Sequence, residues 1–127
     1  LCCSSYETPI GGSLANGVFK MTPASDRLTA WTEADLLRNV RKTADAFGWL
    51  CYHSWSSLHS PGGFPDLTLV RDGRVIFAEL KRDGKNPAPV QQEWLDALAE
   101  VERQTEGKVK ARLWRPANMQ EIMEELR

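Results

Sequence analysis

Two acidic residues stand beside two short apolar runs in the stretch GGFPDLTLVRDGRVIFAELKRDGK. Asp66 opens the first run, and Glu79 lies near the end of the second, two residues before Lys81. The pair Asp72-Gly73 separates the runs, and Asp-Gly between apolar segments is a strong signal for a two-residue β-hairpin turn. We therefore predict that both runs are antiparallel strands whose pairing is set by this turn.

The predicted pairing brings the two acids together. Counting outward from Arg71 opposite Arg74, Asp66 faces Glu79, with their Cβ atoms roughly 4.5–5.5 Å apart. Side chains alternate along a strand, so Lys81 lies on the same face as Glu79. The opposite face is apolar and is expected to pack on helices; it carries Leu67, Leu69, Ile76, Ala78 and Leu80.

Two carboxylates held face to face repel each other and do not stabilise a strand pair. A divalent cation between them removes this repulsion, and oxygen ligands suit Mg²⁺, with Mn²⁺ able to substitute. Lys81 can then orient or deprotonate a water, or neutralise a phosphate oxygen. The alternative is that Asp66 only caps a strand entry and that Glu79 and Lys81 lie where the strand meets water. Three such residues on one face favour metal-assisted phosphodiester hydrolysis.

The rest of the chain predicts an α/β fold. Thr32 and Asp35 have the spacing of a helical capping box. Leu37, Val40, Ala44 and Phe47 would form the inward face of that helix, with Glu33 on the same side. The segments read as helix 32–48, strand 49–55, strands 66–71 and 74–81, helix 90–104, strand 108–116 and helix 117–127.

The motif resembles that of the PD-(D/E)XK nuclease superfamily, with PD at Pro65-Asp66 and ELK at Glu79 to Lys81. More narrowly, GGFPDLTLV, FAELKRDGKNPAPVQQEWL and ARLWRP resemble the VRR-NUC family, over about residues 32–116. The resemblance implies a restriction-endonuclease-like αβββαβ core, with a mixed central sheet flanked by helices. The last helix would follow this core.

The resemblance also implies roles for individual residues. Asp66, Glu79 and the backbone carbonyl of Leu80 would be metal ligands, and Lys81 would be the catalytic lysine. Gln91 resembles the motif glutamine because it lies three residues before Trp94, with Gln92 as the register alternative. Glu33 resembles the acid on the first helix, which holds the metal directly or through water; it could also simply favour the helix dipole.

Basic residues indicate where a DNA backbone could run. Arg71 and Arg74 flank the hairpin tip, and Lys81, Arg82 and Lys85 line the loop after the acids. His59 is a further candidate for contacting phosphate or water, whereas His53 and Cys51 are expected to be structural. Lys108, Lys110 and Arg112 form a stripe on the last strand, which is either a solvated face or part of a DNA surface.

Stand-alone VRR-NUC proteins of phages and bacteria resemble Holliday junction resolvases. The resemblance therefore implies a Mg²⁺-dependent DNA endonuclease acting on branched DNA such as a four-way junction, in which a homodimer makes two symmetric cuts. The alternatives are a flap-, nick- or restriction-like nuclease, and a non-catalytic DNA-binding module of the same fold. The three cysteines, in no metal-type spacing, favour a reducing compartment, and the resemblance implies the cytoplasm of a bacterium or a phage-infected cell.

The whole chain has 127 residues and a net charge of −1. This length suits one folded unit, which we expect at residues 29–127, preceded by a non-catalytic extension at residues 1–28. The charge gives no global basic field, so a nucleic-acid partner would have to use a local basic surface. Five tryptophans are expected to anchor a small core. No apolar run predicts a membrane span.

Overall fold

The computed structural model describes residues 31–55 and 58–127. The expected extension at residues 1–28, and the first two residues of the expected domain, lie outside this part of the chain. Its elements are α3 (Glu33–Ala46), β1 (Leu50–His53), β2 (Leu67–Arg71), β3 (Arg74–Leu80), α4 (Pro89–Gln104), β4 (Val109–Trp114), the 3₁₀ turn η1 (Pro116–Asn118) and α5 (Met119–Leu126). This order confirms the α/β prediction, including the C-terminal helix.

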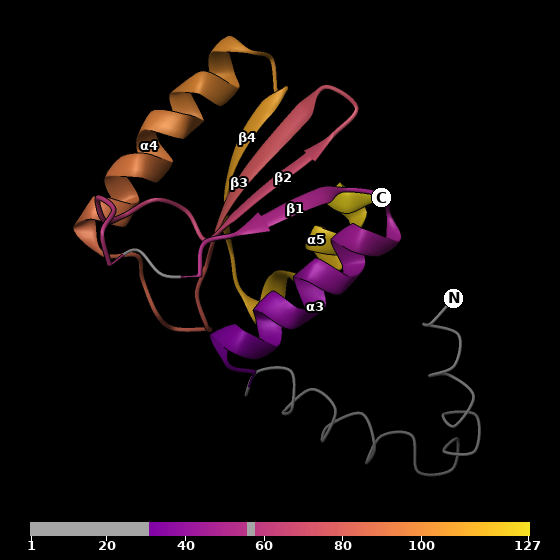
Figure 1. Ribbon diagram of the computed structural model, residues 1–127, viewed down its shortest axis with the longest axis horizontal. Coiled ribbons are helices and arrows are strands. Elements are labelled where there is room, and N and C mark those ends of the chain that lie inside the picture. Colours follow the sequence, from indigo (N-terminus) through magenta and orange to yellow (C-terminus); the bar gives the residue numbers. More distant parts are fainter. Residues whose placement is uncertain (1–30, 56–57) are drawn as a thin grey trace. The chain divides into compact units, whose positions relative to one another are not determined.

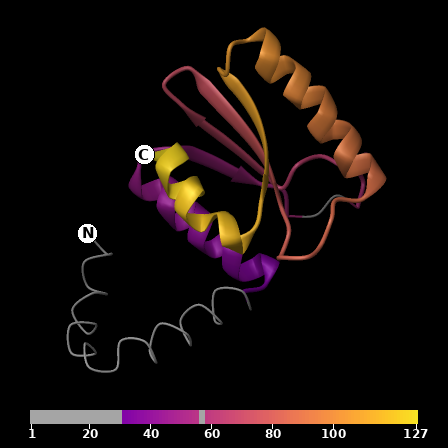
Figure 2. The same ribbon diagram turned by 180° about the vertical axis from the view of Figure 1, so that it is seen from behind.

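The four strands form one mixed sheet in the order β1-β2-β3-β4. The pairs β1–β2 and β2–β3 are antiparallel, and β3–β4 is parallel. The helices α3 and α5 lie next to each other against one face of the sheet, and α4 lies on its other side (Figures 1 and 2). Within residues 31–55 and 58–127, no helix is long and apolar enough to cross a bilayer.

The hairpin between β2 and β3 has the predicted turn and register. Asp72 and Gly73 adopt positive φ angles of 50° and 76°, which a two-residue turn of this type requires. Arg71 pairs with Arg74, and the ladder continues without a bulge to Leu67 opposite Ala78. The strand β2 therefore begins one residue after Asp66.

The apolar face of the hairpin is buried, as predicted. Leu67, Leu69, Ile76, Ala78 and Leu80 form the main core with residues from α3, α5 and β4. In α3 the fully buried positions are Leu36, Val40 and Ala44, whereas Leu37 and Phe47 are only partly buried. The inward face of α3 is thus rotated slightly from the predicted one, and the exposed side chain of Glu33 does not share it.

The tryptophans do not all serve as core anchors. Trp49 and Trp114 are buried, and the indole nitrogen of Trp49 donates to the Leu126 carbonyl at 2.9 Å. Trp94 is partly exposed, and Trp55 is 88% exposed. The expectation that tryptophans stabilise the core therefore fails for Trp55, which follows β1 at the end of the sheet nearest Asp66.

Candidate active site

Three elements bring the predicted catalytic residues to one place. Asp66 directly precedes β2, Glu79 is the penultimate residue of β3, and Lys81 directly follows that strand. Gln91 lies in the first turn of α4. Because Glu79 alternates with the buried residues of β3, its side chain points to the face of the sheet that α4 covers.

Asp66 is fixed by the neighbouring strand. Its Oδ2 atom accepts a hydrogen bond from the backbone N–H of Leu80 at 2.9 Å, and its own carbonyl accepts one from Ser54 N–H at 3.2 Å. The N–H and C=O of one strand residue point to the same neighbouring strand. The carbonyl of Leu80 is therefore directed to the side of Asp66, where a metal ligand was predicted.

Glu79 is almost completely buried, with 1% of its surface exposed. Its Oε2 atom accepts a hydrogen bond from Gln91 Nε2 at 2.6 Å and lies 3.5 Å from Lys81 Nζ. Its Oε1 atom is buried and has no hydrogen-bond partner among the described residues. Burial, followed by repulsion from Asp66, raises the pKa of Glu79 to about 7, although Lys81 opposes this shift.

A buried carboxylate oxygen without a donor is costly, and this one belongs to the predicted metal ligand. A cation held by Glu79 Oε1 and the Asp66 carboxylate would remove that cost, so these residues fit the metal that the motif implies. Within the described part of the chain, no group of three or more His, Cys, Asp or Glu side chains is arranged to hold a metal. Two carboxylates, a carbonyl and several waters suit Mg²⁺, which keeps much of its hydration.

Gln91 is the glutamine that reaches this site. Its Oε1 atom accepts from Ala88 N–H at 2.7 Å at the start of α4, which directs its Nε2 atom toward Glu79. Gln92 is exposed and donates instead to Asp96. The sequence left two candidates for the motif glutamine, Gln91 and Gln92. The structure places Gln91, and not Gln92, beside Glu79.

Glu33 is not joined to the four residues at the site. It begins α3, where its carboxylate is exposed and makes no hydrogen bond or ion pair with any described residue. An acid at this position favours the helix dipole. Any contribution of Glu33 to a metal would need a bridging water or a movement of its side chain.

The loop after the site carries the basic residues that lie nearest to it. Arg82 and Lys85 are both exposed. Arg115, at the end of β4, donates to the Lys85 carbonyl at 2.7 Å and to Asn86 Oδ1 at 3.2 Å. This contact holds the loop beside the site while leaving the Lys85 side chain in solvent.

Two other predicted DNA contacts have structural partners. Arg71 Nη1 donates to the carbonyls of Phe47 and Leu126, at 2.8 and 3.1 Å, and its guanidinium lies 4.6 Å from the ring of Trp49. Arg74 lies 5.5 Å from the same ring. Arg71 is five residues from Asp66, and Arg74 is five residues from Glu79. Each separation corresponds to roughly 17 Å along a strand. Arg71 therefore serves to tie α3 to α5, and neither arginine lies at the site.

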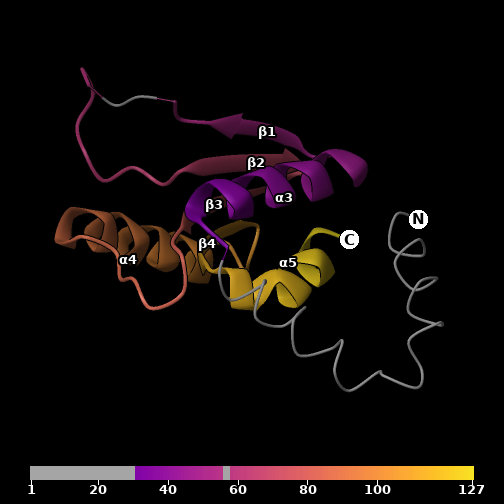
Figure 3. The same cartoon turned by 90° about the horizontal axis from the view of Figure 1, so that it is seen from below.

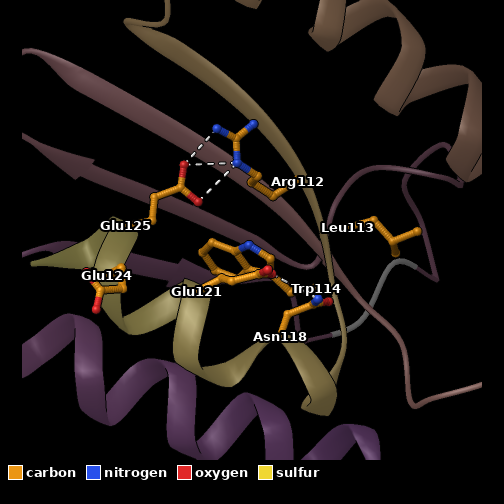
Figure 4. A pocket seen from close by; sticks show the side chains of 7 residues that line it. All are labelled: Arg112, Leu113, Trp114, Asn118, Glu121, Glu124 and Glu125. Atoms are coloured by element: carbon orange, nitrogen blue, oxygen red, sulfur yellow. Dashed lines mark hydrogen bonds and ion pairs between the residues drawn. The ribbon is translucent and has the colours of Figure 1, made fainter.

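The basic stripe of the last strand is also largely neutralised. Lys110 pairs with Glu125 at 3.4 Å, and Arg112 pairs with Glu102 and Glu125 at 3.1 and 2.7 Å. Figure 4 shows Arg112 and Glu125 joined above Trp114, beside a cavity of about 510 Å³ between β4 and α5. Lys110 and Arg112 are thus half-buried and engaged by acids of α4 and α5, so they are not free to act as a basic stripe.

Aromatic residues beside Asp66 were not singled out by the sequence. A cavity of about 620 Å³ adjoins the site and is lined by Tyr52, Ser54, Trp55, Ser60, Pro61, Gly63, Phe64, Asp66, Gln91 and Trp94. The aromatic and apolar run WLCYHSW predicts a strand, because aromatic residues favour strands, but it does not predict which of its rings are exposed. The segment that leads into β2 runs beside the start of α4 (Figure 3), where Gly63 closely approaches Val90 and Trp94.

The histidines and the described cysteine have simpler roles. His53 packs edge to face with Trp55, with ring centroids 6.1 Å apart. His59 is exposed in the loop before Asp66 and makes no hydrogen bond to a described residue. Cys51 packs against the core, as expected, and burial raises the pKa of its thiol.

Comparison with models of known protein families finds no match to this chain, and a search of curated proteins also finds no significant match. The resemblance to VRR-NUC nucleases therefore depends on the motif residues alone, and it remains a prediction.

Proposed function

We propose that this chain is a metal-dependent DNA endonuclease of the PD-(D/E)XK type, similar to the VRR-NUC family. The observation that carries the proposal is the convergence of Asp66, Glu79, Lys81 and Gln91, with Glu79 Oε1 buried and unpartnered. A fold gains no stability from this arrangement, because two neighbouring carboxylates repel and one of them is desolvated. A hydrolytic metal site accounts for all four residues.

In the proposed mechanism Asp66, Glu79 and the Leu80 carbonyl would hold Mg²⁺, with Mn²⁺ as a substitute. Bound there, the ion would lower the pKa of a water and polarise the scissile phosphate. Lys81, beside Glu79, orients that water or neutralises a phosphate oxygen. Gln91 donates to Glu79 Oε2 and leaves Oε1 without a donor, so that Oε1 would be available as a metal ligand. Arg82 and Lys85 contact the phosphates that flank the cut.

The proposed substrate is branched DNA, with the four-way junction as the leading candidate. The exposed basic residues near the site would contact phosphates, and such contacts carry no sequence information. Recognition by DNA shape is therefore favoured over base reading. Two symmetric cuts in a junction would need a homodimer.

A matched pair of variants tests this function. Asp66→Asn keeps an oxygen that can accept from Leu80 N–H but removes the charge, and Asp72→Asn makes the same change at the exposed turn of the same hairpin. Cleavage of labelled four-way junction, flap, nicked and linear duplex DNA in Mg²⁺ is the measurement. We expect Asp66→Asn to lose about 10²-fold or more in rate and Asp72→Asn to cleave like the unaltered protein.

Each outcome of this assay is informative. Mg²⁺-dependent cleavage that survives Asp66→Asn unchanged would show that the site assignment is wrong. Efficient cutting of plain duplex with no preference for branches would rule out junction resolution. If the unaltered protein binds DNA and cleaves none of the substrates with Mg²⁺ or Mn²⁺, the chain is a binding module.

A further inference from the structure

The cavity beside Asp66, here called the aromatic pocket, has the lining of a site for a nucleobase. Its walls combine aromatic rings with the hydroxyl groups of serines. Its volume of about 620 Å³ lies within the range of roughly 300–1,000 Å³ that is usual for ligand pockets. Asp66 and Gln91 form the wall that it shares with the proposed metal site.

We propose that the aromatic pocket binds one unpaired base of the DNA substrate, next to the phosphate cleaved at Asp66 and Glu79. The inference depends on the proposed nuclease function and makes its substrate class more specific. A base can enter such a pocket only when it is out of the double-helical stack. The preferred substrates are therefore DNAs with an unpaired nucleotide beside the cut, such as flaps and opened junction cores.

The charge of the pocket favours a base over a phosphate. None of its lining residues is a lysine or an arginine, and Asp66 carries the charge among them. A phosphate inside the pocket would find no cationic side chain in this lining to pair with. A neutral base has a π face for stacking and polar edges that Ser54, Ser60 and Gln91 can meet.

The exposed aromatics supply the stacking surface. Trp55 is 88% exposed and Tyr52 is 64% exposed, and these two lining residues belong to β1 and to the segment that directly follows it. Stacking of a base on an aromatic side chain contributes about 1–3 kcal/mol and tolerates any base. Exposed apolar patches rimmed by polar residues mark ligand-binding or interaction surfaces, and the rings here adjoin serine hydroxyls in one pocket.

The inner wall of the pocket is already formed. Phe64 packs edge to face with Phe77 and Trp94, at centroid distances of 5.8 and 5.1 Å. Gly63 brings its loop so close to α4 that an added Cβ would lie 2.7 Å from the Val90 carbonyl oxygen. A preformed wall lowers the ordering cost of binding, which suits a site that must capture a transiently unpaired base.

The test measures binding in EDTA, so that it does not depend on cleavage. Fluorescence anisotropy compares a labelled single-stranded oligothymidylate with a blunt duplex of the same length, for the full chain and its Trp55→Ala variant. We expect the variant to bind the single strand about 10- to 100-fold more weakly and the duplex with nearly unchanged affinity. Trp55→Phe should restore most of the single-strand affinity.

Leu50→Ala is the matched control, because Leu50 lies on β1, the strand that Trp55 follows, is 74% exposed and does not line the pocket. It should bind both DNAs like the unaltered protein. Equal affinity of Trp55→Ala and the unaltered protein for the single strand would overturn the inference. An equal loss of affinity for the single strand and the duplex would also overturn it. So would a change in sedimentation mass that accounts for the loss of affinity, because Trp55 would then be a contact between copies of the chain.

Failure of the proposed function gives a different pattern. Trp55-dependent binding of the single strand without any Mg²⁺-dependent cleavage would contradict the nuclease function but support the proposal that the aromatic pocket binds a base. Cleavage that depends on Asp66, without Trp55-dependent binding of the single strand, would support the nuclease and contradict the base-binding pocket.

Discussion

Glu79 is a carboxylate that the fold buries although burial opposes its ionisation. Its pKa is raised to about 7 from a usual value of 4.5 because it is desolvated and faces Asp66. Lys81 and Gln91 satisfy one of its oxygens and leave the other without a donor among the described residues. The residue thus reduces stability in the absence of metal, which is understandable if its role is catalytic.

The raised pKa predicts how stability depends on pH in the metal-free protein. Below about pH 4.5 Glu79 is protonated in both the folded and the unfolded chain, so it contributes no difference. Above about pH 7 it is charged in both, and the folded state carries the full cost. The free energy of unfolding should therefore fall as pH rises from about 5 to 8, by on the order of 1–3 kcal/mol from this group. Urea denaturation in EDTA across this range is the measurement.

Glu79→Gln isolates this contribution. In EDTA at pH 8 the variant should unfold at a higher urea concentration than the unaltered protein, while its Mg²⁺-dependent cleavage should fall by about 10²-fold or more. Glu93→Gln, at an exposed position of α4, should change neither property. A Glu79→Gln variant that is less stable at pH 8 would contradict the account of a strained carboxylate.

Gln91 and Gln92 allow a second matched comparison. Gln91→Met removes the donor to Glu79 Oε2 and the acceptor for Ala88 N–H. We expect a loss of about 10- to 100-fold in cleavage rate, because a residue that orients a metal ligand typically has an effect of this size. Gln92→Met, on the exposed side of the same turn, should be nearly neutral. Equal rates for the two variants would show that Gln91 does not orient Glu79.

At the scale of elements, the loop from β1 to β2 and the start of α4 build the site together. Gly63 has a φ of 96°, and a Cβ there would clash with the Val90 backbone and touch Trp94. Gly63→Ala should therefore destabilise the protein by about 1–3 kcal/mol. Gly62→Ala, where an added Cβ meets nothing within 4 Å, should be close to neutral. Thermal unfolding of both variants checks the difference, and equal melting temperatures would mean that the close approach is not needed.

The hairpin shows what the sequence could establish about these elements. The Asp-Gly turn fixed the register, and with it the meeting of Asp66 and Glu79, because a two-residue turn leaves one pairing possible. The spacing of Gln91 from Trp94 selected the correct face of α4. The periodicity of α3 identified the helix but favoured Leu37 where Leu36 is the buried residue, because both lie close to the same stripe.

The roles of the arginines could not be predicted from local sequence patterns. Arg71 binds carbonyls at the ends of α3 and α5, and Arg112 binds Glu102 and Glu125. These partners lie on other elements, so only the packing of the helices brings them together. The aromatic pocket also depends on tertiary packing, since Tyr52 belongs to β1 and Trp94 to α4. Local patterns carry no information about either.

At the scale of the whole molecule, the net charge of −1 means that a DNA-binding surface would have to consist of a few exposed cations near the site. Junction resolution further predicts a two-fold dimer. Sedimentation equilibrium should give about twice the chain mass of 14.3 kDa, both free and with a four-way junction. A protein that stays monomeric when bound to the junction would instead favour a single-cut activity, such as flap or nick cleavage.

The most direct test of the central claim is anomalous diffraction from crystals of the protein soaked in Mn²⁺. The account predicts an ion bound by the Asp66 carboxylate, Glu79 Oε1 and the Leu80 carbonyl, with Mn–O distances of about 2.0–2.3 Å, and no ion in crystals of Glu79→Gln. An anomalous peak elsewhere on the molecule, or an empty site at saturating Mn²⁺, would contradict it.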